Sequence, residues 1–338
     1  MLLRSTAILA TLLLVFSSIS LFIGVIELDI TNLFSKEGLE ILFISRFPRL
    51  LAIILSGVAL SVAGLIMQQL VQNNFVSPTT GGTISSAQLG ILIALIFIPD
   101  SSIYGRAIFA FIVAMIGTWI YVGFIQAIKF KDSVMVALVG IMFGYVIGGI
   151  TSYLAFRYGL VQTLSTWLTG SFSLIIKGRY EILYITLPLV VVAFLFANYF
   201  NIVGLGKEFS KNLGVPYSVV LFLGMSLAAM LTASVVVVVG AISYIGLIVP
   251  NLIKMFKGDN LKGTLVDTAL FGALFVLVCD ILGRLIMAPY ELPIDLIAGV
   301  LGSLVFIALI FIKLKKGDKK VVAFVKGCGG FIKVKNEN

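Results

Sequence analysis

The stretch RFPRLLAIILSGVALSVAGLIMQQLVQNN, residues 46–74, decides the fold of this chain. After Arg49 it continues over residues 50–71 without one charged side chain. An α-helix needs about 20 such residues to cross roughly 30 Å of hydrocarbon. The stretch therefore predicts a transmembrane helix with Arg46 and Arg49 near one end and Asn73 and Asn74 at the other.

Similar apolar runs recur along the whole chain. Of its 338 residues, 60% are hydrophobic and 12% are charged, and the mean hydropathy is +1.16, whereas a soluble domain is about 25% charged. We expect an all-α, polytopic membrane protein with about ten transmembrane helices. The expected helices are 6–26, 50–71, 81–98, 107–128, 134–156, 181–200, 217–240, 264–283 and 293–312. Two shorter stretches broken by Gly and Pro, 159–176 and 241–253, are expected to be partial or re-entrant segments inside the protein.

The distribution of positive charge predicts the topology. The first run exceeds a typical signal-peptide core and lacks a clear A-x-A cleavage site, so we expect it to be retained. With the N-terminus placed in the cytoplasm, 16 of the 24 Lys and Arg residues fall inside, eight of them from Lys313 onward. The positive-inside rule then predicts two cytoplasmic termini. We expect a transmembrane domain over 1–313 and a Lys-rich cytoplasmic tail near anionic lipid headgroups over 314–338.

Composition and missing motifs exclude several functions. The chain has no histidine and only two cysteines, Cys279 and Cys328, so neither a bound metal, a cofactor nor a disulfide framework is expected. The net charge of +9 is spread over the connections between apolar runs, which does not favour nucleic-acid binding. A phosphate-binding loop is missing, because Gly204-Leu-Gly206-Lys207 has the wrong spacing and no following Ser or Thr. No esterase elbow or zinc-protease motif occurs either, which leaves transport, channel or anchoring roles.

Four segments carry a family resemblance by their order and spacing. They are Arg46-Phe-Pro48-Arg49-Leu50-Leu51 with Gly57, Gly64, Gln68 and Asn73; Gly206 to Val215; Gly240 to Asn251; and Asp280 to Arg284 with Glu291-Leu292-Pro293. Over roughly residues 40–312 they resemble the FecCD-type permeases of ABC importers for ferric siderophores, haem and vitamin B12. Two positions depart from the family pattern, since Asn74 replaces a proline and Asn251 a histidine. The loop 73–80 looks most like Gram-positive iron-siderophore permeases, which favours a ferric siderophore.

The resemblance implies a permease subunit in a bacterial plasma membrane, and not an enzyme. Its partners would be a second permease subunit, identical or paralogous, two ATPase subunits, and an extracytoplasmic substrate-binding protein that delivers the chelate. Transport would proceed by alternating access. Two rival functions use different chemistry. An ion-coupled secondary transporter would need a membrane-embedded titratable site, for which Asp280 is the main candidate. A membrane-embedded enzyme would need a nucleophile and base, which the sequence does not reveal.

Three arginines are the expected docking residues for the binding protein. Arg46, Arg49 and Arg284 fall on the predicted outer side, where the positive-inside rule disfavours them. In the family, arginines at matching positions bind carboxylates of the binding protein, and a guanidinium can pair bidentately with a carboxylate. The alternative is that they only extend to lipid headgroups. Asp280 lies four residues before Arg284, so the two can pair along one helix.

Inner loops are expected to couple the chain to its ATPase and to form a gate. The segment 201–216 is too polar to enter lipid and resembles the loop that docks on the ATPase, although an ordinary charged connection would look similar. The expected coupling residues are Gly206, Glu208, Leu213 and Gly214. By the same resemblance, the cytoplasmic gate candidates are Asn73, Asn74, Phe75, Asp132 and Ser133, which could instead be turn residues.

Overall fold

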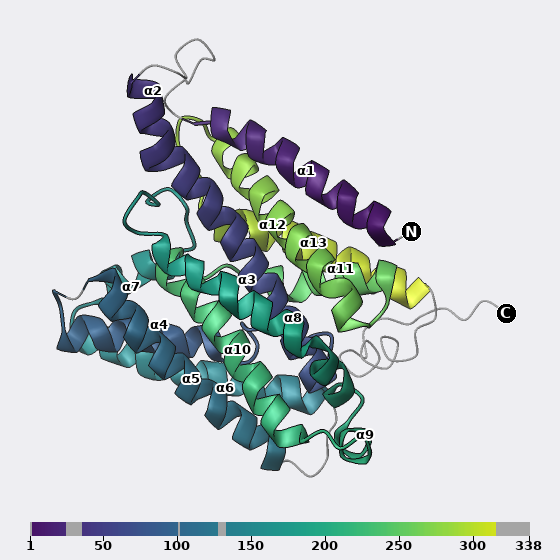
Figure 1. The fold of residues 1–338 in the computed structure, drawn as a ribbon. Helices are drawn as coiled ribbons and strands as arrows, with labels where there is room; N and C mark the ends of the chain where they lie inside the picture. Colours follow the sequence, from purple (N-terminus) through teal and green to yellow (C-terminus); the bar gives the residue numbers. More distant parts are fainter. Residues whose placement is uncertain (1, 25–35, 101, 128–132, 316–338) are drawn as a thin grey trace.

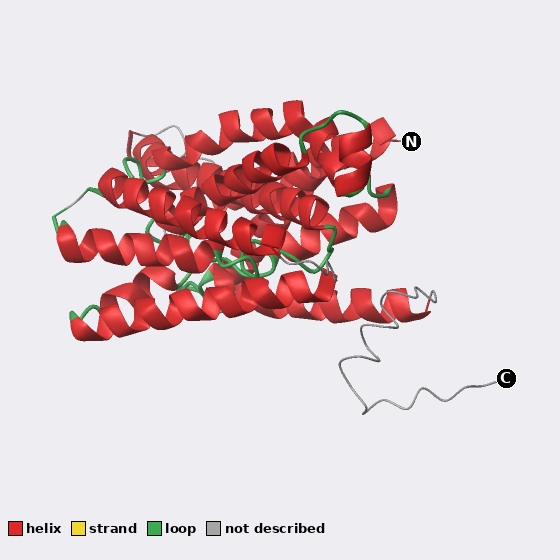
Figure 2. Cartoon of the chain, turned by 90° about the horizontal axis from the view of Figure 1, so that it is seen from below, coloured by secondary structure: helices red, strands yellow, loops and turns green. Residues whose placement is uncertain are grey.

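The computed structural model describes residues 2–24, 36–100, 102–127 and 133–315 (Figure 1). Within these ranges the chain is a bundle of helices without a named strand, as Figure 2 shows, which confirms the all-α prediction. The helices are α1 (Leu2–Phe22), α2 (Lys36–Ile41), α3 (Phe47–Val71), α4 (Thr83–Phe97), α5 (Ile103–Ala127), α6 (Ser133–Arg157), α7 (Val161–Leu168), α8 (Thr186–Val203), α9 (Lys207–Asn212), α10 (Tyr217–Val238), α11 (Ile245–Lys257), α12 (Leu261–Leu285) and α13 (Ile294–Lys315).

Each predicted apolar run overlaps one of these helices, with ends that differ by up to a few residues. Six helical stretches in the described ranges are long and apolar enough to cross a bilayer, and shorter apolar helices lie at 6–22, 83–97 and 294–309. The cytoplasmic location of the termini stays a prediction. Most of the predicted tail, including Cys328, lies outside the described residues, and so does Asp132.

Helix α3 is the centre of the bundle. It packs against α12, α10, α11 and α8, while α1 covers α12, and α4, α5 and α6 form a group beyond α10 (Figure 1). Glycines let the backbones touch: a Cβ on Gly64 would lie 1.9 Å from the carbonyl oxygen of Gly246 in α11. A Cβ on Gly57 would lie 2.5 Å from the carbonyl oxygen of Gly272 in α12. Small residues allow this close approach, which is a main source of helix association in membranes.

The helix that carries the two N-terminal arginines begins earlier than predicted. Helix α2 continues through a five-residue π-helix, Leu42–Arg46, into α3, so Arg46 and Arg49 lie one turn apart on one helix. Pro48 in the first turn of α3 has no N–H to donate to the carbonyl of Ile44. The backbone N–H of Lys177 donates to that carbonyl instead, at 3.0 Å. A tertiary contact therefore satisfies the group that proline leaves without its helical partner.

The two segments predicted to be broken lie against each other. The backbone N–H of Ala241 donates to Leu168 at 3.2 Å, and that of Ser171 donates to Val239 at 3.0 Å. Such cross-bonding satisfies irregular backbone inside a membrane protein. Most of α11 is buried, as predicted. In α7, Leu164 is the only buried residue of this short helix, so the segment 159–176 lies only partly inside this single chain.

Candidate functional site

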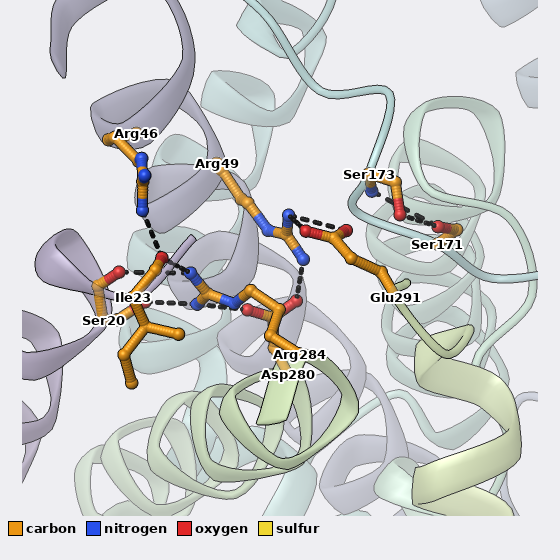
Figure 3. A network of polar contacts seen from close by, with 9 residues as sticks. All are labelled: Ser20, Ile23, Arg46, Arg49, Ser171, Ser173, Asp280, Arg284 and Glu291. Carbon is orange, nitrogen blue, oxygen red and sulfur yellow. Dashed lines mark hydrogen bonds and ion pairs between the residues drawn. The ribbon is translucent and has the colours of Figure 1, made fainter. Parts of the chain in front are cut away.

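Charged side chains gather where α1, α3 and α12 meet (Figure 3). Arg46 and Arg49 come from the start of α3, Asp280 and Arg284 from the end of α12, and Glu291 from the connection to α13. We call these five residues the arginine network. The structure thus brings together all three predicted docking arginines.

Arg49 is the hub of the network. One terminal nitrogen donates to both carboxylate oxygens of Glu291, at 2.8 and 2.9 Å, and the other donates to Oδ1 of Asp280 at 2.8 Å. Burial alone would raise the pKa of Glu291, but the hydrogen bonds and positive charge of Arg49 outweigh it and lower that pKa. Glu291 is therefore ionised at neutral pH and joins α3 to the segment before α13.

Arg284 is held by the C-terminal end of α1. Its guanidinium donates to the carbonyls of Ser20 and Ile23, at 3.1 and 2.8 Å, and to the Ser20 hydroxyl at 2.5 Å. It also forms an ion pair with Oδ2 of Asp280 at 2.5 Å, which confirms the pairing along one helix. Arg46 donates to Ile23 as well. Cations at a helix C-terminus are favourable because the last carbonyls carry partial negative charge.

All members of the network except Asp280 line a cavity of about 620 Å³, which Gly24, Glu40 and Ser173 also line. Arg46 and Arg284 are buried, and the Arg49 side chain is 12% exposed. None of the three guanidiniums lies on an open surface in this conformation. Their docking role therefore stays a prediction, and it requires the network to rearrange.

Of the partners of these arginines, the sequence predicts only Asp280, as the partner of Arg284. Glu291 was part of a recognised motif but had no assigned role, and Ser20 and Ile23 lie in an apolar run where nothing marks them. Their contribution is mostly backbone carbonyl oxygens, which every residue has. Apart from the spacing of Asp280 and Arg284, the sequence signal for this site is the surplus of arginine on the predicted outer side.

Asp280 should be the most sensitive member of the network. Replacing it with alanine leaves Arg49 and Arg284 buried without the carboxylate they share, and breaking a buried ion pair in this way costs about 3–5 kcal/mol. We expect the unfolding midpoint of Asp280→Ala in detergent to fall sharply, measured by thermal unfolding. Asp259→Ala, at an exposed loop position, is the matched control. Equal midpoints for the two variants would contradict the structural role of the network.

The predicted coupling segment lies at the opposite end of α3, roughly 37 Å away for a 25-residue helix. Helix α9 is flanked by Gly206, with φ +114°, and Gly214, with φ +71°, conformations that favour glycine. Glu208 is exposed. Leu205, Phe209 and Leu213 are spaced by four residues and are each more than half exposed.

We call Leu205, Phe209 and Leu213 the α9 patch. Leu213 is among the expected coupling residues and the other two are not, although the spacing of four residues indicates that all three share one helix face. A patch of large apolar side chains beside a charged, lipid-avoiding segment is typical of a protein–protein contact. The patch lies close to α3, because Gly204, the residue before Leu205, packs against the side chain of Gln69 near the end of that helix.

Three gate candidates, Asn73, Asn74 and Phe75, form a short segment after α3, and two of them contact neighbouring helices. The Asn73 side chain accepts the backbone N–H of Phe75 at 2.8 Å, which is a turn contact. Asn251 donates to the Asn74 carbonyl at 2.7 Å, and Lys254 donates to the Asn74 side chain at 3.1 Å. These contacts join the segment after α3 to α11. The ring of Phe75 meets that of Phe306 in α13 edge-on at 6.1 Å. The Ser133 side chain is outside the described part, and the gating role stays a prediction.

Comparisons with known proteins agree with one another. The model of the FecCD transport family matches residues 12–312. The chain is 44% identical to the petrobactin import system permease protein YclN of Bacillus subtilis, over 88% of this chain and 95% of that protein. It is 36% identical to the ferric-anguibactin transport system permease protein FatD of Vibrio anguillarum, over 86% and 93%. It is 38% identical to the petrobactin import system permease protein FatD of Bacillus anthracis, over 88% of both chains.

The fold also matches a solved structure, described as an inward-facing conformation of a metal-chelate type ABC transporter. The TM-score is 0.79 at 24% identity, and the match covers 92% of this chain and 99% of the other. At this identity the likeness concerns the fold alone.

Proposed function

This chain belongs to the FecCD transport family, and from that premise we propose that it is the membrane-spanning permease subunit of an ABC importer for a ferric siderophore. The observation that carries the proposal is the 44% identity to a petrobactin import permease along nearly the full length of both chains. The apolar helices agree with a multi-pass membrane protein. We place it in the bacterial plasma membrane with both termini in the cytoplasm.

The proposed transporter needs partners at both ends of the bundle. We assign the arginine network to the outer side, where an extracytoplasmic binding protein would deliver the chelate. We assign the α9 patch to the inner side, where it would contact one of two ATPase subunits, because this sequence has no phosphate-binding loop of its own. A second permease subunit, identical or paralogous, would complete the path. Residues 1–313 form the permease domain in this proposal, and 314–338 a tail at the inner membrane surface.

Alternating access would open the chelate path first to the outer side and then to the inner side. Helix α3 connects the two ends, since Arg49 lies in its first turn and its last residue precedes the segment that α11 contacts. Movement of α9 by the ATPase would reach α3 through the contact between Gly204 and Gln69. The rival secondary-transport mechanism would need a titratable group that faces an ion path. Asp280 is less suited to that role, because two arginines neutralise it and its side chain is buried.

The relatives also suggest the first substrate to test. Two of the three relatives described above are named for petrobactin import and the third for ferric anguibactin. We therefore propose a ferric siderophore as cargo, with ferric petrobactin as the first compound, and keep haem and vitamin B12 as alternatives within the same class of importer.

The test is uptake by vesicles that contain the permease together with the ATPase and the binding protein of the proposed importer. We expect iron-labelled siderophore to enter only when ATP and the binding protein are both present. An ATPase variant that binds but does not hydrolyse ATP is the control. Uptake driven by an ion gradient without ATP would support the secondary transporter. ATP-dependent uptake of haem or vitamin B12 in place of any siderophore would keep the class and change the substrate.

A further inference from the structure

We propose that Glu291 acts as an internal substitute for a carboxylate of the binding protein, and that docking exchanges one carboxylate for the other on Arg49. The inference rests on the proposed function, because it assumes a binding protein at the arginine network. Glu291 would then have two effects. It stabilises the undocked state, and it competes with the carboxylate of the binding protein for Arg49. The partner group is a Glu or Asp side chain, because guanidiniums line the cavity.

Arg49 cannot take a bidentate partner in its present state. Glu291 occupies one terminal nitrogen through both of its oxygens, and Asp280 occupies the other. The strongest contact of a guanidinium with a carboxylate is bidentate, with two nitrogens that donate two parallel hydrogen bonds, and both terminal nitrogens of Arg49 are already engaged. A carboxylate from another protein would therefore need one of the two resident acids to leave.

Glu291 is the acid that can leave. Asp280 lies within α12, its side chain is 4% exposed, and it also pairs with Arg284. The side chain of Glu291 is 19% exposed and lies on the non-helical segment between α12 and α13. The same segment exposes Met287 and Tyr290, so it offers apolar contacts to a docked protein. Release of Glu291 from Arg49 would separate this segment from α3, while Asp280 stays paired with Arg49 and Arg284.

The network has donors ready for an incoming acceptor. The Nε groups of Arg49 and Arg284 are buried and form no hydrogen bond with any residue in the described ranges. A buried donor without a partner is costly, so an acceptor that reaches these groups gains more than it would at a saturated site. The cavity of about 620 Å³ beside them has room for an acidic side chain.

Glu291→Gln is the decisive variant, because it removes the charge and keeps the size of the side chain. We expect the purified binding protein to bind the Glu291→Gln permease, assembled with its ATPase in nanodiscs, about fivefold more tightly than the wild type. Arg49→Gln should bind several-fold more weakly. Glu40→Gln is the matched control, since it removes another negative charge from the same cavity wall without touching Arg49, and its affinity should stay close to wild type.

The outcomes separate the inference from the function on which it rests. Unchanged or weaker binding by Glu291→Gln, with the unfolding midpoint of the wild type, would overturn the exchange. An equal gain in Glu40→Gln would also overturn it, because the gain would then be a general effect of charge. If Glu291→Gln is less stable than the wild type, Glu291→Asp is used in its place. The shorter acid reaches Arg49 poorly, so we expect a smaller gain in affinity for the binding protein. No gain in affinity would contradict the inference. Failure of the wild type to bind would overturn the proposed function itself.

Discussion

Replacing Gly64 with leucine should abolish the folded protein. A Cβ at this position would lie 1.9 Å from the backbone carbonyl oxygen of Gly246, and backbone atoms cannot rotate away as a flexible side chain could. The helices α3 and α11 would have to separate along their contact. Overpacking already costs about 1–3 kcal/mol where a core can adjust, and native proteins are stable by only about 5–15 kcal/mol.

The measurement is the yield of monodisperse protein in detergent, with the unfolding midpoint of whatever folds. Gly123→Leu is the matched control: Gly123 is also within a long apolar helix, α5, but a Cβ there would meet no atom of the described residues within 4 Å. We expect a normal yield from this control and little or none from Gly64→Leu. Similar yields would mean that α3 and α11 do not pack backbone to backbone.

Phe209→Glu should abolish uptake while leaving the permease folded. The Phe209 side chain is 62% exposed in this chain, so its replacement removes little internal packing. In the proposed transporter it would enter an apolar groove of the ATPase, where a buried carboxylate without a partner is strongly unfavourable. We expect uptake of labelled ferric siderophore to fall by at least tenfold, and stimulation of ATP hydrolysis by the loaded binding protein to be lost.

Binding of the binding protein to the outer side should be unchanged in Phe209→Glu, and this binding serves as the folding control.

Gly214→Trp should show the same loss of uptake and of ATPase stimulation, because position 214 has φ +71°, where a non-glycine residue costs about 1–2 kcal/mol. Leu213 would be displaced as well. Phe256→Glu is the comparison, since Phe256 is 77% exposed near the end of α11. Loss of uptake in Phe256→Glu but not in Phe209→Glu would move the coupling surface to residues 254–262.

The positions of the long helices could be predicted because lipid leaves a clear pattern. An uninterrupted apolar run such as 50–71 has few alternatives to a spanning helix. The continuous helix from α2 to α3 could not be predicted. Lys36 and Glu37 are charged and Pro48 disfavours a helix interior, so these residues indicate a boundary where the chain is in fact helical. The chain nevertheless stays helical there through a π-helix and the hydrogen bond from Lys177 to Ile44. That bond joins residues 133 positions apart, and no local pattern encodes it.

The candidate site was predictable in its charged residues and not in their connections. The four-residue spacing of Asp280 and Arg284 predicted their pairing. Arg49 and Glu291 are 242 residues apart, so only the folded chain brings them together. The carbonyls of Ser20 and Ile23 carry no side-chain signal at all. Residues of the α9 patch were partly visible as an i, i+4 series, which a search for exposed apolar spacing would have found.

The direct backbone contacts of α3 with α11 and α12 have a mechanical consequence. Two helices separated by side chains can slide, because the layer between them deforms as rotamers change. Gly57 and Gly64 leave no such layer, so α3, α11 and α12 should behave as one stiff lever. Arg49 is at one end of that lever, and Lys254 with its contact to Asn74 is near the other. A displacement at the arginine network should therefore tilt α3, α11 and α12 together, so that the far end of α3 moves as well.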